Sequence, residues 1–125
     1  MKNKILITLI AASLFSCTKR IARPPVKGIV VDSVTTLPMK NVSILTWNEK
    51  SEEYISEVVT NKKGEFSLPK IEYYDLLSIG AEAPAQMFQF KVSADKYNLK
   101  EIEENSRYGF SSDTIFYNIK MSLRK

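Results

Sequence analysis

Apolar and polar residues alternate along two stretches in the second half of the chain, 88–95 and 115–124. A period of two places successive side chains on opposite faces of an extended backbone, so each stretch predicts a β-strand with one buried face and one solvent face. The residues expected to face the core are Phe88, Phe90, Val92 and Ala94 in the first stretch, and Ile115, Tyr117, Ile119, Met121 and Leu123 in the second. Asn118 and Lys120 are expected to face solvent.

Shorter segments rich in β-branched and aromatic residues predict further strands over 26–31, 42–47, 54–60 and 65–68. Gly64 lies in the polar turn before the last of these, where a hairpin is expected to need one residue at positive φ, with Asn61 as the alternative. Many short strands separated by turn residues predict an all-β fold, an antiparallel β-sandwich of about seven strands.

The segment 70–85 is apolar and aromatic for a connection. One interpretation is a strand over 74–79 followed by a loose Gly, Ala and Pro connection, and this is the one we favour. The other is an insertion that carries a binding surface, because long loops with apolar content are often functional. After residue 17, only 71–81 offers a stripe of apolar residues at helical spacing.

The first 17 residues combine a short positive start, Met1 to Lys4, with an apolar run over 5–12. That run is too short to cross a bilayer, which needs roughly 20 apolar residues, and is typical of a secretory signal. Leu14, Ser16 and Cys17 then give an aliphatic residue, a small residue and a cysteine at the spacing of the bacterial lipoprotein signal peptide, which this segment resembles. Phe15 is bulkier than that family usually has.

The resemblance implies that residues 1–16 are a cleaved signal peptide and that Cys17 carries a lipid anchor of diacylglyceryl and acyl chains such as palmitate. Cys17 is the only cysteine, so it cannot form an internal disulfide. The alternatives are an ordinary cleaved signal with an incidental cysteine, or an N-terminal membrane anchor. Thr18, a non-acidic residue after the cysteine, implies the outer membrane, facing the periplasm, by the sorting pattern of enterobacterial lipoproteins.

Residues 17–25 are expected to form a basic linker between the lipid and the domain. Its proline pair, Pro24 and Pro25, favours an extended and fairly stiff spacer. Lys19, Arg20 and Arg23 would then lie near anionic headgroups and attract them weakly. A solvated tether with incidental charges is the other interpretation.

Four pieces of the remaining chain, 26–125, occur in a recognisable order. They are a Gly-x-Val-x-Asp strand over 28–32, a Pro-led segment over 38–44, a Thr-Asn-x-x-Gly-x-Phe turn over 60–66, and a strand over 90–97 that ends at Tyr97. This order resembles the carboxypeptidase regulatory-like domain, a transthyretin-like (prealbumin-like) β-sandwich. Asn61 and Lys96 depart from the usual Asp and Gly of that family. The resemblance implies a fold and an accessory or binding role, not a chemistry.

Composition narrows the function further. The chain has 18 Lys and Arg against 14 Asp and Glu, and removal of residues 1–16 leaves a net charge of only +2, which argues against nucleic acid as a partner. With no histidine and with Cys17 committed to lipid, the chain lacks the residues for a catalytic triad or a His-based metal site. We therefore expect no enzyme, no metal and no cofactor. The enzyme outsider is a carboxylate-based hydrolase using the acids over 101–104, which we interpret as a solvated face.

The sequence therefore predicts a membrane-anchored lipoprotein whose sandwich docks on another cell-envelope protein. The alternative is a module that binds carbohydrate or another small ligand through exposed aromatic residues. The candidate contact residues are Trp47, Tyr73, Tyr74, Tyr108 and Phe110. Tyr108 and Phe110 lie in the polar loop over 105–113, where they would either be exposed or cap one end of the sandwich. An aromatic cluster beside a concavity would favour the ligand, and a flat apolar sheet face would favour the protein partner.

Overall fold

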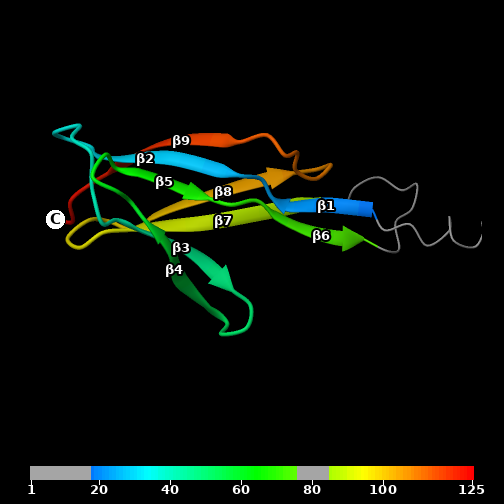
Figure 1. Ribbon diagram of the computed structural model, residues 1–125. Coiled ribbons are helices and arrows are strands. Elements are labelled where there is room, and N and C mark those ends of the chain that lie inside the picture. Colours follow the sequence, from blue (N-terminus) through cyan, green and yellow to red (C-terminus); the bar gives the residue numbers. More distant parts are fainter. Residues whose placement is uncertain (1–17, 76–84) are drawn as a thin grey trace, which may run out of the picture.

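The computed structural model describes residues 18–75 and 85–125, which form an all-β fold (Figure 1). The predicted signal peptide, Cys17 and residues 76–84 lie outside the described residues. The strands are β1 (Thr18–Arg23), β2 (Val26–Asp32), β3 (Ser43–Asn48), β4 (Glu53–Val59), β5 (Glu65–Leu68), β6 (Ile71–Asp75), β7 (Gln86–Ser93), β8 (Lys100–Ser106) and β9 (Ile115–Met121).

The strands form a three-stranded sheet in the order β5-β2-β9, a four-stranded sheet in the order β4-β3-β7-β8, and a two-stranded ribbon of β1 and β6. The first two sheets pack face to face, and their seven strands confirm the predicted sandwich. The ribbon extends beyond one end of it, and the chain's C-terminus lies at the other end (Figure 1).

One pair of strands departs from the predicted antiparallel arrangement. β2 runs parallel to β9, with Val26 opposite Ile115 and Asp32 opposite Met121. The chain crosses from β8 in one sheet to β9 in the other, so β9 starts beside the start of β2, where the Ile115 amide donates to Pro25 O at 2.9 Å. Alternation along a strand predicts its buried face but not the direction of its neighbour.

The core lies between the two sheets and consists of the inward residues that the alternation predicted. The Phe90 ring meets Phe66 and Tyr117 of the opposite sheet edge to face, with centroids 6.0 and 5.5 Å apart. Ile119 and Met121 are fully buried, whereas Leu123 is 55% exposed, so its predicted burial is wrong. Beyond Met121 the chain has left the sheet, and Leu123 forms only an isolated bridge to Tyr97. The buried apolar residues are Val26, Val30, Val42, Ile44, Phe66, Leu68, Phe88, Phe90, Val92, Ile119 and Met121.

The turn over 61–64 joins one sheet to the other, because β4 belongs to the four-stranded sheet and β5 to the three-stranded sheet. The predicted hairpin is therefore wrong, but Gly64 does hold the positive φ, at 73°, and Asn61 does not. Instead, the Asn61 side-chain oxygen accepts hydrogen bonds from the amides of Lys63 and Glu65, at 3.0 Å each. Gly64 O also accepts a bond from the Val30 amide at 2.8 Å, which ties this turn to β2.

The motif residues of the sequence meet one another in space. A Cβ on Gly28 would lie 2.5 Å from the Phe66 ring, so the glycine makes room for that ring. The Asp32 carboxylate accepts the Tyr97 hydroxyl at 2.6 Å and the amides of two following residues. These bonds, that of Tyr97 foremost, lower the pKa of Asp32 to about 2. The motif thus serves the fold, by making room for the Phe66 ring beside β2 and by fixing the end of β2.

Two predictions about connections are corrected. Thr18–Arg23, expected to be a linker, is strand β1, whose backbone pairs with β6. The strand that we placed over 74–79 begins earlier, at Ile71, and the described part of the 71–81 segment is extended rather than helical. Both corrections have one cause. β1 and β6 pair with each other, so each strand supplies partners for the backbone N–H and C=O groups of the other.

β8 was not predicted as a strand. Glu101 and Glu103 do face solvent, as the charged run suggested, while Ile102 between them packs against the core. β8 lies at the edge of its sheet, and an edge strand carries charge on its outer face at little cost. One apolar residue among several acids gives too weak an alternation to indicate a strand.

Candidate functional site

The five candidate aromatic residues do not form one site. Trp47 lies on the outer face of the four-stranded sheet, on β3. Tyr73, Tyr108 and Phe110 line a depression of about 250 Å³ between the β1–β6 ribbon and the loop after β8. Tyr74 is the next residue along β6 and so faces the opposite side of the ribbon from Tyr73, where it is 68% exposed.

We call the group of Trp47, Tyr54, Gln89 and Lys91 the aromatic face. Trp47 pairs directly with Tyr54 across β3 and β4, and their rings lie 5.3 Å apart at 71°. Lys91 places its ammonium group 4.0 Å from the centre of the Tyr54 ring, and the Gln89 amide donates to the Tyr54 hydroxyl. Two side chains of β7 therefore hold Tyr54 of β4 in place, and Tyr54 supports a tryptophan on β3 that is 51% exposed.

Carboxylates border the aromatic face on the β8 side. On β8, Glu101 lies opposite Lys91 and forms an ion pair with it at 3.3 Å, and Glu103 lies opposite Gln89. The outer surface of this sheet therefore changes from aromatic at β3 and β4, through a cation and an amide on β7, to acidic at β8. Tyr54, Gln89 and Lys91 were not among the residues predicted from the sequence, although the alternation along β7 already placed the last two on the solvent face.

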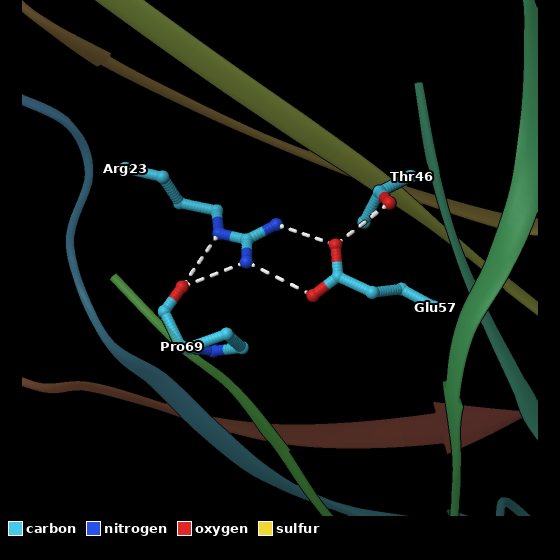
Figure 2. A network of polar contacts seen from close by, with 4 residues as sticks. All are labelled: Arg23, Thr46, Glu57 and Pro69. Atoms are coloured by element: carbon cyan, nitrogen blue, oxygen red, sulfur yellow. Dashed lines mark hydrogen bonds and ion pairs between the residues drawn. The ribbon is translucent and has the colours of Figure 1, made fainter. Parts of the chain in front are cut away.

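A buried network of polar groups joins β1 to the sandwich (Figure 2). Arg23 is only 6% exposed and donates both terminal nitrogens to the Glu57 carboxylate, at 3.0 Å each. Its guanidinium also donates twice to Pro69 O, at 3.1 and 2.7 Å, and Thr46 donates to Glu57 at 2.9 Å. The expectation that Arg23 would lie near lipid headgroups is wrong, because this cation is itself buried and pairs there with the partly exposed carboxylate of Glu57.

Glu57 reaches Arg23 because of a bulge in β4. Ile44 pairs with Val58 and Leu45 with Ser56, which leaves Glu57 as an extra residue whose side chain is redirected. Partial burial raises the pKa of Glu57, but the hydrogen bonds and charge of Arg23 outweigh it, so the pKa lies below its usual value. These groups satisfy one another, and the network joins β1 to β4 and to the end of β5.

The acids of β8 do not converge on one cleft. Glu104 points to the opposite side of the strand from Glu103 and accepts the Tyr117 hydroxyl at 2.7 Å. Burial, together with this carboxylate, raises the pKa of Tyr117. In the part of the chain that the structure describes, no three His, Cys, Asp or Glu side chains lie close enough together to hold a metal ion.

The depression beside the ribbon combines rings with polar groups. The Gln86 amide donates to the Tyr73 hydroxyl at 2.8 Å, and Ser111 and Ser112 line the opposite wall. Tyr108 is 63% exposed, whereas Phe110 packs against Phe88 with ring centroids 5.1 Å apart. The two rings were predicted either to be exposed or to cap one end of the sandwich. Phe110 caps the end of the core, whereas Tyr108 is exposed.

A second and shallower depression, of about 770 Å³, lies over the outer face of the three-stranded sheet. Its exposed apolar residues are Ile29, Phe116 and, from β4, Val59, and Lys27 on β2 lies beside Phe116. The sequence placed Phe116 on the solvent face without assigning it a role. The polar neighbours Ser67 and Asn118 break up the apolar surface here.

Neither a scan against protein-family models nor a search of curated proteins found a match for this chain. Within residues 18–75 and 85–125, no helix is long and apolar enough to cross a membrane.

Proposed function

We propose that this protein is a lipid-anchored component of the bacterial cell envelope whose β-sandwich docks on another envelope protein through the aromatic face. The anchoring part of this proposal rests on Leu14, Ser16 and Cys17 in the sequence, and Thr18 after the cysteine favours the outer membrane, facing the periplasm. The docking part rests on one observation, an exposed tryptophan held against an ordered tyrosine on a sheet face.

The aromatic face suits a protein partner better than a sugar. Trp and Tyr are the residues that most often dominate the binding energy of protein interfaces. The two rings meet at 71°, so they offer no common plane on which a sugar chain would stack. Neither of the two depressions described above includes Trp47 or Tyr54. With Glu101 and Glu103 along one side, the complementary partner has an apolar centre and a basic border.

We also propose that the domain is transthyretin-like, of the carboxypeptidase regulatory-like type. Three details support this relationship. Gly28 makes room for Phe66, and Asp32 accepts the Tyr97 hydroxyl, so the motif residues depend on one another. Lys96 has a φ of 69° at the position where the family pattern has glycine, which is the residue that most easily adopts this conformation.

A second candidate function is carbohydrate binding in the depression beside the ribbon. The exposed Tyr108 ring, the Tyr73 hydroxyl and the serine hydroxyls of the loop provide both an apolar surface and hydrogen-bonding groups. Ligand sites commonly combine these two features, although this depression is at the small end for a ligand pocket. Binding of soluble glycans that Tyr108→Ala abolishes and Trp47→Ala leaves intact would support this candidate over protein docking.

Site-specific photo-crosslinking in cells tests the docking surface. A photoreactive residue replacing Trp47 is expected to crosslink one envelope protein, and the same residue replacing Phe116 is the control, since Phe116 is 74% exposed on the other sheet. Adding Lys91→Glu should remove the crosslink by placing a carboxylate beside Tyr54 and Glu101. Equal crosslinking from both positions, or a crosslink that Lys91→Glu leaves unchanged, would contradict docking through this face.

Processing of the N-terminus tests the anchor separately. Mass spectrometry of the protein from envelope fractions is expected to show a chain that begins at Cys17 and carries acyl groups. Cys17→Ala should give a protein that is uncut or released from the membrane and no longer incorporates a fatty-acid probe. An intact segment 1–16 on the wild-type protein would rule out lipid anchoring at this residue.

A further inference from the structure

The position of β1 removes the slack between the proposed lipid and the domain. Thr18 is already paired with Asp75 in the ribbon, and Cys17 precedes it directly. One extended residue spans at most about 3.6 Å, so acyl chains on Cys17 would begin within one residue of ordered structure. The predicted spacer over 17–25 would have separated the domain from the membrane, whereas with a lipid on Cys17 the ribbon would place this end of the domain at the membrane surface.

The ribbon is also joined firmly to the sandwich. Arg23, at the inner end of β1, binds Glu57 of β4 and the Pro69 carbonyl (Figure 2). Tyr73 of β6 bonds with Gln86 at the start of β7. These contacts link β1 to β4 and β6 to β7. The position of the ribbon therefore determines the orientation of the whole sandwich.

The surface around this end carries the residue types that favour membrane interfaces. Lys19 lies directly opposite Tyr74 on the outward side of the ribbon, with 55% of the lysine side chain and 68% of the tyrosine exposed. Tyr108, on the neighbouring loop, has the Arg107 guanidinium 5.7 Å from its ring centre. Tyrosine is enriched at headgroup depth, and Lys and Arg extend their charges to anionic lipid. Glu72 pairs with Lys19 at 2.6 Å and offsets part of this charge.

We infer that the ribbon end, which comprises β1, β6 and the loop 107–112, is a membrane-binding surface that rests on phospholipid headgroups and holds the sandwich in one orientation. This inference rests on the proposed lipid anchoring. The ribbon meets the bilayer end-on, so that Tyr74 on one side of it and Tyr108 on the other both lie at headgroup depth, and Lys19 and Arg107 face the lipid phosphates. The β3–β4 hairpin projects from the sandwich in a different direction from the ribbon (Figure 1), so Trp47 stays clear of the bilayer and available to a partner.

Depth-dependent fluorescence quenching tests this orientation. The full chain is expressed in a bacterium, purified from envelopes and reconstituted into phosphatidylcholine and phosphatidylglycerol vesicles that contain brominated lipid. Trp47, the only tryptophan, is the natural reporter of the sandwich. Tyr108→Trp in a Trp47→Phe background reports the ribbon end, and Phe116→Trp in the same background is a matched control at another exposed aromatic position. We expect loss of fluorescence for the Tyr108→Trp reporter and little loss for the other two.

Charge reversal adds a second readout. Lys19→Glu with Arg107→Glu should reduce quenching of the Tyr108→Trp reporter in vesicles with phosphatidylglycerol and change it little in phosphatidylcholine alone. Equal quenching of all three reporters, or none for the Tyr108→Trp reporter, would overturn the proposed orientation. Mass spectrometry of Cys17 in the same preparation separates the two proposals. Acylated Cys17 without quenching refutes only the membrane-facing surface, and unmodified Cys17 with quenching refutes only the anchor.

Discussion

The Arg23–Glu57 pair makes an asymmetric prediction about stability. The Arg23 side chain is 7% exposed, whereas the Glu57 side chain is 28% exposed. Removing one member of a buried ion pair leaves the other without its partner, and the cost depends on how well water reaches the remaining charge. We therefore expect Glu57→Leu to destabilise the protein more than Arg23→Met does.

The magnitudes follow from what each variant leaves behind. Glu57→Leu leaves the buried guanidinium with Pro69 O alone, and should cost about 3–5 kcal/mol, the usual range for breaking a buried pair. Arg23→Met leaves a partly hydrated carboxylate that still accepts from Thr46, together with an unpaired Pro69 carbonyl, and should cost about 1–3 kcal/mol. The double variant removes both charges and should be at least as stable as Glu57→Leu, because apolar replacement of a whole buried pair is often neutral.

Urea unfolding followed by Trp47 fluorescence measures these differences as changes in the free energy of unfolding at an unchanged slope. Lys91→Met is the matched control, because it removes the ion pair with the 67% exposed Glu101 side chain and should cost no more than about 1 kcal/mol. If Arg23→Met proved as costly as Glu57→Leu, unequal burial would not determine the penalty. If both matched the surface control, β1 would not be held by this network.

Three further predictions concern the fold. Gly64→Val should lower the free energy of unfolding by about 1–3 kcal/mol or more, since this position has a φ of 73° and a Cβ there would lie 2.5 Å from the Val30 carbonyl oxygen. Thermal melts would show this loss, and an unchanged melting temperature would contradict the turn assigned to 61–64. Ile119→Ala should cost about 2–5 kcal/mol and Lys120→Ala within about 0.5 kcal/mol, and equal costs in urea would contradict the assigned buried face. Tyr97→Phe should raise the pKa of Asp32 from about 2 toward the usual aspartate value of 3.8, as measured by NMR titration. Because the pKa of Asp32 is lowered in the folded state, its ionised form stabilises the fold above pH 3.8, and this stabilisation is lost as the pH falls toward 2. Tyr97→Phe should therefore lose less stability in acid than the wild type. An unchanged pKa of Asp32 in this variant would refute the hydrogen bond from Tyr97.

The sequence alone determined the fold class and most of the buried face, because period-two alternation is a local property of an extended chain. The strands over 88–93 and 115–121 bury the residues that this pattern selected. The left-handed conformation at Gly64 was also predictable, since it depends on the absence of a Cβ at that one position. Each of these inferences needs only neighbouring residues and no knowledge of the partner strand.

Tertiary structure decided everything that depends on a partner distant in the sequence. Whether Arg23 is a solvated charge or a buried one depends on Glu57, 34 residues away and turned inward by a bulge. The pairing of β1 with β6 likewise turned an expected spacer into a strand. The aromatic face exists only because β4 and β7 bring Tyr54 and Lys91 together near Trp47. The charge of each residue, its aromatic character and the alternation of apolar residues can be read from the sequence. Which side chains pair with one another, and which are buried, depends on strand register, and the register forms only when the sheets assemble.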